Sequence, residues 1–138
     1  MKNNIEYLNS FINELGFLVL KLNIMIKIYH NSRCSKSREG LKVLEDSGKK
    51  FEVVKYLEEI PTKDELRNII SCLDIKPINL IRKSEAIWKE KFKNLPLSDE
   101  ELLDAMVTYP KLIERPIVIN GNRAVIGRPA SNIDSLIN

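Results

Sequence analysis

The sequence predicts an α/β fold with the element order β-α-β, a helical insert and then β-β-α. Residues 24–57 show the pattern strand, polar turn, helix and strand. The motif Asn120-Gly121-Asn122 stands between two short apolar runs and predicts a hairpin. Residues 61–109, between these two parts, carry helical start signals. A chain of 138 residues is long enough for one domain with its own core.

The first unit predicts two parallel strands joined by a helix. Ile24 to Tyr29 is apolar and rich in β-branched residues, which indicates a buried strand. A helix is expected from about Ser35 to Ser47, because its apolar residues share one face and Gly48 can end it. Phe51 to Leu57 has the composition of a second strand, and a strand-helix-strand unit favours a right-handed parallel crossover.

The remaining elements are predicted by helix caps and turn residues. Pro77 to Phe92 is expected to hold short helices and loops, and Ala130 to Ile137 a short closing helix. The capping-box patterns Thr62/Glu65 and Ser98/Glu101 predict helices over Lys63–Leu73 and Asp99–Val107, and the hairpin strands are expected at Pro116–Ile119 and Ala124–Ile126.

The first 24 residues differ from the rest of the chain. Ile5, Leu8, Ile12 and Leu15 have helical spacing, and Gly16 is a suitable residue to end a helix. Two interpretations stay open for residues 1–24. They form an extra helix that packs on the core or on a partner, or they are a start-site artefact that precedes a domain of residues 25–138. No chemistry is assigned to them.

Composition argues against several classes of protein. A net charge of +3 is only mildly basic, so no nucleic acid is expected as a partner. Two cysteines cannot build a disulfide framework, and with a single histidine they argue against a metal site. No apolar run approaches the ~20 residues that span a bilayer. We therefore expect no membrane association and a reducing, cytoplasmic location.

The turn between the first strand and the first helix carries the most informative residues. Cys34 stands where the helix begins, and there the unpaired backbone N–H groups and the positive end of the helix dipole favour a thiolate. Arg33, Lys36 and Arg38 add positive charge nearby. His30, the only histidine, lies four residues before the cysteine. We therefore predict that Cys34 is a nucleophile ionised near neutral pH, and not an inert buried cysteine.

The residues around Cys34 leave alternatives open. His30 either tunes the thiol or caps the strand end, and Arg38 either supports the thiolate or is a solvated helix arginine. The spacing C-x-x-S puts Ser37 where a dithiol oxidoreductase has its second cysteine, so the sequence predicts a monothiol cycle. The second thiol then comes from outside or from Cys72, and Cys72 fits a small core or surface residue better.

Arg82, Arg115 and Arg128 each stand at the border of a predicted element. Arg115 and Arg128 precede proline, which favours extended geometry, and an X-Pro bond that opens a central strand is a candidate cis peptide. Arginine offers planar bidentate donors that match tetrahedral oxyanions such as phosphate or arsenate. Either each arginine is a surface charge, or the three converge and hold an anion against the thiolate.

Several separate motifs follow one another from Met25 to the C-terminus: His30-Asn31-x-x-Cys34-x-x-Ser37-Arg38, Tyr56-Leu57-Glu58, Leu80-Ile81-Arg82-Lys83, the run from Pro110 to Val118, and Gly127-Arg128-Pro129. In unbroken order they resemble the thioredoxin-fold arsenate reductases that depend on glutathione and glutaredoxin. The resemblance implies a thioredoxin-like core with a helical insertion, which agrees with the predicted element order.

The resemblance also implies a reaction. Cys34 attacks arsenate and forms a covalent cysteine–arsenate adduct, and His30 matches the residue thought to support the thiolate. Arg82, Arg115 and Arg128 match the three oxyanion-binding arginines of the family. Glutathione, as co-substrate, attacks the adduct, arsenite is formed, and glutaredoxin clears the glutathionylated Cys34. No metal or bound organic cofactor is implied.

Residues of the turn depart from the best-studied reductases, which carry Pro where Ser32 stands and Gly-Thr where Ser35-Lys36 stand. These departures motivate one alternative, a monothiol enzyme that acts on another oxidant or on glutathionylated proteins. A second alternative is an Spx-like regulator that binds RNA polymerase and senses redox state through C-x-x-C. Ser37 argues against it, because it removes the dithiol switch.

Overall fold

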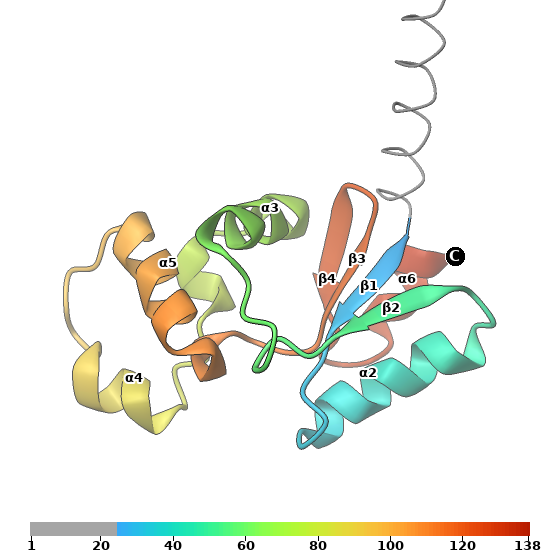
Figure 1. Cartoon of the computed structure of the whole chain (residues 1–138), viewed down its shortest axis with the longest axis horizontal. Coiled ribbons are helices and arrows are strands. Elements are labelled where there is room, and N and C mark those ends of the chain that lie inside the picture. The colour runs from blue at the N-terminus through green and yellow to red at the C-terminus, as the bar shows by residue number, and fades with distance from the viewer. Residues whose placement is uncertain (1–24) are drawn as a thin grey trace, which may run out of the picture.

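A computed structural model describes residues 25–138, so the expectations for residues 1–24 lie outside the described part of the chain. Its centre is a four-stranded sheet (Figure 1). The strands are β1 (Ile26–Tyr29), β2 (Phe51–Val54), β3 (Ile117–Asn120) and β4 (Arg123–Ile126). Their order is β2-β1-β3-β4, with β1 parallel to β2 and antiparallel to β3, and β4 antiparallel to β3. The α/β class and the predicted element order are confirmed.

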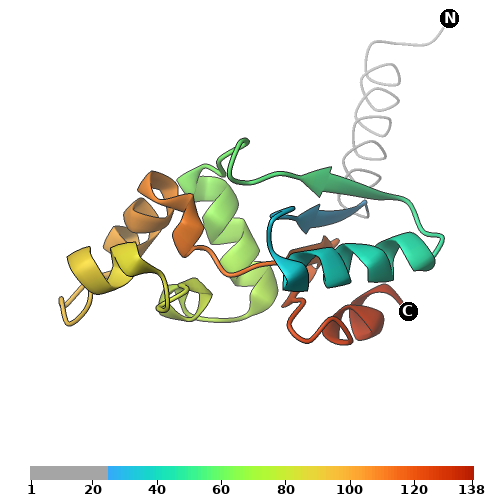
Figure 2. The same cartoon turned by 90° about the horizontal axis from the view of Figure 1, so that it is seen from below.

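Helices cover both faces of the sheet, as Figures 1 and 2 show together. α2 (Ser35–Asp46) and α6 (Asn132–Ile137) pack on one face, where Ile28 and Val118 are buried. Ile117 and Ile119 belong instead to the core that the sheet shares with the helical insert. Because side chains alternate along a strand, consecutive residues of β3 are buried in different layers.

The insert is a helical unit between β2 and β3. Its apolar side chains form the larger core cluster of the described residues together with one face of the sheet, and Leu66, Leu80 and Met106 are fully buried there. It contains α3 (Lys63–Leu73), the 3₁₀ turn η1 (Pro77–Leu80), α4 (Ala86–Lys91), α5 (Asp99–Thr108) and the 3₁₀ turn η2 (Pro110–Leu112).

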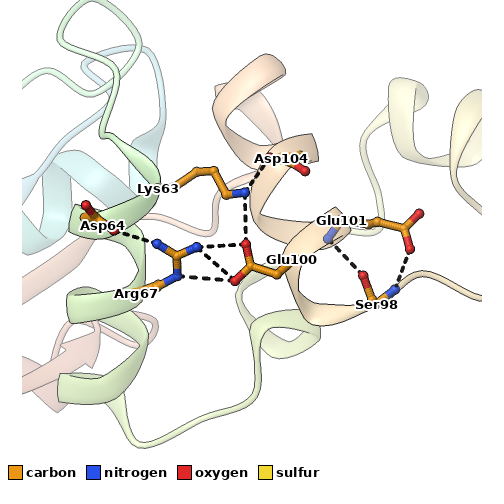
Figure 3. A network of polar contacts seen from close by, with 7 residues as sticks. All are labelled: Lys63, Asp64, Arg67, Ser98, Glu100, Glu101 and Asp104. Atoms are coloured by element: carbon orange, nitrogen blue, oxygen red, sulfur yellow. Dashed lines mark hydrogen bonds and ion pairs between the residues drawn. The ribbon is translucent and has the colours of Figure 1, made fainter.

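Ion pairs connect α3 to α5 within the insert (Figure 3). Lys63 Nζ lies 2.9 Å from a carboxylate oxygen of Glu100 and 2.8 Å from Oδ1 of Asp104. Arg67 Nη2 donates to both oxygens of Glu100, at 2.8 and 2.9 Å. The carboxylates are exposed, so salt screens this network and its contribution to stability is small.

The two predicted capping boxes form to different extents. At Ser98 the box is complete, because its Oγ accepts from the Glu101 N–H and the Glu101 carboxylate accepts from the Ser98 N–H, both at 3.2 Å (Figure 3). At Thr62 the side chain accepts from the Glu65 N–H at 3.1 Å, which is half of the box. The predicted starts of α3 and α5 are confirmed.

The predicted strand ends need correction. β2 ends at Val54 rather than at Leu57, because the chain turns at Lys55. The Lys55 carbonyl accepts from the N–H groups of Glu58 and Glu59 at 3.0 and 2.8 Å. β3 begins at Ile117 rather than at Pro116, because proline has no N–H to donate to a ladder. Gly48 follows α2 with a left-handed φ of 71°, as its predicted stop role requires.

Candidate active site

Cys34 lies in the turn between β1 and α2, directly before the first helical residue. Its backbone is extended, with φ −97° and ψ 123°, and its carbonyl accepts from the Arg38 N–H at 3.0 Å. Its own N–H donates to the Asn31 carbonyl at 3.0 Å, which closes the turn. The half-buried thiol is therefore at the helix N-terminus, where the sequence predicts it.

The surroundings of Cys34 favour the thiolate. Partial burial raises the pKa of the thiol, but donors around it reverse this effect. The backbone N–H groups of Ser37 and Lys36 reach it from the first turn of α2, and the Arg115 guanidinium reaches it from a distant segment. The net pKa of Cys34 therefore lies below the ordinary thiol value, and the helix N-terminus and a buried arginine cause the shift together.

His30 and Ser37 form a buried contact across this turn. The imidazole Nδ1 lies 2.7 Å from Ser37 Oγ, which also accepts from the Asn31 N–H at 3.0 Å. Burial lowers the pKa of His30, the Ser37 contact opposes this in part, and the charges of Lys55 and Arg38 add to the lowering. The backbone N–H of His30 donates to the last residue of β2 at 2.9 Å. His30 therefore both ends the strand and holds the turn through Ser37.

A single β-bridge brings two of the predicted arginines together. Ile81 pairs antiparallel with Ile113, which aligns the segment after η1 with the segment after η2. The Arg82 N–H donates across this bridge at 2.7 Å, and the Glu114 N–H donates back at 2.8 Å. Arg82 and Arg115, distant in the sequence, therefore leave neighbouring backbones.

Glu85 joins these two arginines and is a site residue that the sequence analysis missed. Arg82 Nη1 lies 2.6 Å from Glu85 Oε1, and Arg115 Nη1 lies 4.0 Å from the same oxygen. The spacing of three residues between Arg82 and Glu85 was the available sequence signal, because it is typical of a local ion pair. The contact to Arg115 has no such signal.

Arg115 is the most buried of the predicted arginines, with 7% of its surface exposed. Its Nε is buried and has no hydrogen-bond partner among the described residues. A buried donor without a partner is costly. The Arg115 guanidinium, which acts on the Cys34 thiol, therefore keeps one N–H donor that no described residue uses.

Arg128 and Arg38 come from different segments of the chain and are positioned by different contacts. The Gly127 N–H donates to the Pro116 carbonyl at 2.8 Å, so the half-buried Arg128 follows a residue that pairs with the Arg115 segment. The bonds Arg115–Pro116 and Arg128–Pro129 are both cis. Arg38 Nη1 donates to the Ser32 carbonyl at 2.9 Å, so this exposed side chain stabilises the turn between β1 and α2.

Tyr56 is a second site residue that the sequence analysis did not assign to the site. Only 1% of it is exposed, and burial raises its pKa to about 12. The charges of Arg115 and Arg82 and a hydrogen bond to Asn31 oppose this rise. The phenol therefore stays protonated and is close enough to Cys34 and Arg115 for their charges to act on it.

A cavity of about 250 Å³ lies against the turn, where β1 and β2 end. The carboxyl ends of parallel strands are a common position for ligand sites. Two cations, one carboxylate and polar turn atoms line it: His30, Asn31, Ser32, Arg33, Lys55, Leu57 and Glu58. The cavity is therefore adjacent to the thiol turn and carries charges of both signs.

Cys72 lies on α3, and its Sγ is 4.0 Å from Asn68 Oδ1 on the same helix. Burial raises the pKa of Cys72, which is the opposite of the shift at Cys34. Within residues 25–138, no three His, Cys, Asp or Glu side chains are close enough to hold a metal ion. In the same range, no helix has the length and apolar character needed to cross a bilayer.

Comparison with known proteins shows which family the chain belongs to. The model of the ArsC family matches residues 29–136. The chain belongs to the ArsC family. It is 41% identical over 114 residues to an arsenate reductase of Neisseria meningitidis serogroup B, covering 81% of this chain and 97% of the relative. It is 43% identical to an uncharacterized protein of Escherichia coli K12, covering 81% of this chain and 96% of that one.

Solved structures of ArsC relatives have the same fold. An arsenate reductase from Vibrio cholerae has a TM-score of 0.79 and 40% identity, and the match covers 83% of this chain and 98% of that structure. The resemblance to thioredoxin-fold arsenate reductases that the sequence motifs indicate is confirmed. The ArsC match contains all seven predicted site residues: His30, Cys34, Ser37, Arg38, Arg82, Arg115 and Arg128.

Proposed function

We propose that this protein reduces arsenate to arsenite, with the Cys34 thiolate as the nucleophile. The observation that carries the proposal is the juxtaposition of Cys34 with the buried guanidinium of Arg115, whose Nε has no partner. A thiolate and an anion repel each other, so cations beside the thiolate lower the cost of bringing them together. Relatives that carry the name arsenate reductase support this substrate.

The first step forms a covalent bond between Cys34 and arsenic. The thiolate sulfur attacks the arsenic(V) centre, and one oxygen of arsenate leaves as water after protonation. Arg115 and Arg82 bind the remaining oxygens, because guanidinium donors match a tetrahedral oxyanion. We propose Arg128 as the third arginine that binds these oxygens, because it matches the third oxyanion-binding arginine in the resemblance to arsenate reductases.

The second step needs one external thiol, and we propose glutathione. Its thiol and Cys34 together supply two electrons, so they end as a mixed disulfide while arsenic(V) leaves as arsenite. Ser37 cannot form a disulfide with Cys34, which supports an external donor. The cavity beside the turn supports it too, since Lys55 and Arg33 suit the carboxylates of glutathione and Glu58 suits its ammonium group.

The third step restores the thiolate of Cys34. A thiolate of glutaredoxin attacks the glutathione sulfur of the mixed disulfide, and Cys34 leaves as the thiolate. The low pKa that the turn gives to Cys34 makes it a good leaving group in this exchange. No metal and no bound organic cofactor take part in the proposed cycle.

The test is arsenite formation by the purified protein with glutathione and glutaredoxin. The wild type should turn over, and Cys34→Ser should not. Cys72→Ser is the matched control, because it removes the other thiol, and it should retain full activity. Arg115→Lys keeps the charge but loses the planar donors, so it should raise KM for arsenate. Arsenite formation that persists in Cys34→Ser would refute the proposed nucleophile.

A further inference from the structure

Glu85 precedes α4, yet its carboxylate does not cap that helix. Instead one oxygen, Oε1, faces two guanidinium groups that come from different segments of the chain. It lies 2.6 Å from Arg82 Nη1 and 4.0 Å from Arg115 Nη1. The side chain of Glu85 is 24% exposed, and those of Arg82 and Arg115 are 28% and 9% exposed. The three groups are thus partly withdrawn from water.

The carboxylate of Glu85 reduces the electrostatic repulsion between Arg82 and Arg115. Two cations held close together repel each other, and water screens them poorly where they are buried. A carboxylate between them offsets the repulsion before any substrate binds. The contact with Glu85 uses Nη1 of each guanidinium, which leaves the other nitrogens of each planar group for another anion.

We propose that Glu85 is a positioning residue, which holds Arg115 beside Cys34 and Arg82 close to Arg115, in the geometry that the oxyanion needs. This inference rests on the proposed function and deepens it. Glu85 does not touch the reacting atoms. It acts through the two arginines, so its loss should affect substrate binding and the environment of Cys34 more than the chemical step.

Two other roles make different predictions. If Glu85 only adds negative charge, its neutralisation should strengthen anion binding, because repulsion of the anion decreases. The thiolate of Cys34 should then also become more stable. If Glu85 only supports the start of α4, its neutralisation should change neither quantity. The positioning role alone predicts weaker anion binding together with a less stable thiolate, because Arg115 leaves its place beside the thiol.

The experiment compares Glu85→Gln, Glu85→Asp and the wild type in arsenate turnover. Glu85→Gln should raise KM for arsenate about tenfold and change kcat little, which is the signature of lost ground-state and transition-state binding alike. Glu85→Asp keeps the charge but withdraws the carboxylate by one methylene, so it should resemble Glu85→Gln. Glu90→Gln is the matched control, since it removes an exposed carboxylate from α4, the helix that follows Glu85, and it should behave as the wild type.

A second readout does not depend on turnover. The rate of Cys34 alkylation by iodoacetamide, measured against pH in a Cys72→Ser background, should have its midpoint at higher pH in Glu85→Gln. Protection of Cys34 by inorganic phosphate, an unreactive tetrahedral anion, should weaken about tenfold, in step with KM. If the wild type formed no arsenite, the proposed function would fail, while these two measurements would still decide the role of Glu85. A midpoint that stays in place or moves to lower pH would overturn the positioning role, and so would unchanged or stronger protection by phosphate.

Discussion

The imidazole Nδ1 of His30 lies 2.7 Å from the hydroxyl oxygen of Ser37, and both side chains are buried. This contact connects the residue after β1 to the first turn of α2. Cys34 lies between the two residues, so the contact fixes the loop that carries the thiol. The serine that replaces the second cysteine of a dithiol motif therefore has a structural function in this turn.

Ser37→Ala should destabilise the protein without removing the activated thiol. The variant leaves the Asn31 N–H and His30 Nδ1 without their buried partner, which costs ~1–3 kcal/mol. The backbone N–H of Ser37, which favours the thiolate, remains in place. Urea unfolding should show the loss, while the pH midpoint of Cys34 alkylation should stay close to that of the wild type. Ser135→Ala, at an exposed hydroxyl, is the control, and equal stability of both variants would contradict the prediction.

Alkylation at neutral pH should distinguish the two cysteines. The pKa of Cys34 lies below the ordinary thiol value because the donors around it outweigh burial, whereas burial raises the pKa of Cys72. Iodoacetamide should therefore modify Cys34 faster at pH 7, and the midpoint of its pH–rate profile should lie lower. Mass spectrometry of Cys34→Ser and Cys72→Ser measures each thiol separately. Faster labelling of Cys72 would show that the turn does not activate Cys34.

His30 should make the protein less stable as the pH falls below about 6.5, the ordinary pKa of histidine. Burial lowers the pKa of His30 in the folded state, so between the two values the unfolded chain binds the proton and the folded chain does not. Stability therefore decreases as pH decreases through this window and levels off below the folded-state pKa.

The measurement is urea unfolding between pH 7 and pH 5 for the wild type and His30→Asn. The variant removes this titrating group, so its loss of stability over the interval should be smaller than that of the wild type. Parallel curves for the two proteins would mean that His30 has the same pKa in the folded and unfolded states.

Lys55→Glu should weaken the use of glutathione while arsenate binding stays unchanged. Lys55 lines the cavity next to the turn, whereas Arg115 does not line it, and a carboxylate at position 55 would repel the carboxylates of glutathione. We expect KM for glutathione to rise about five- to tenfold and KM for arsenate to change less than twofold. Lys50→Glu, at the other end of β2, is the control. An equal rise in both KM values would assign Lys55 to the oxyanion site instead.

Glu100→Gln should lower the thermal midpoint slightly, and salt should reduce the difference. Arg67 and then Lys63 lower the pKa of Glu100, so its contribution is present above the ordinary carboxyl pKa and is lost as the pH falls through the folded-state value. Because these groups are exposed, ions screen them. Scanning calorimetry at low and high salt measures the effect, with Glu59→Gln as an exposed carboxylate outside the network. A difference that persists at high salt would indicate a contribution other than ion pairing.

The sequence by itself determined the elements and the reactive turn. Periodicity, caps and turn residues are local signals, so the helix start at Asp99, the hairpin around Gly121 and the position of Cys34 before α2 could all be predicted. The activation of Cys34 is also local in part, since the N–H groups of Lys36 and Ser37 belong to its own helix turn.

Only the tertiary structure decided which charges meet at the thiol. Arg82 and Arg115 come together through a β-bridge between segments that are about thirty residues apart. Burying the charge of Arg115 is costly, and the nearby carboxylate of Glu85 offsets part of that cost. The same long-range packing places Tyr56 near these two arginines, and the spacing of residues in the sequence does not predict this position. Burial and charge pairing depend on the distances between segments, and those distances exist only after the sheet and the insert have folded together.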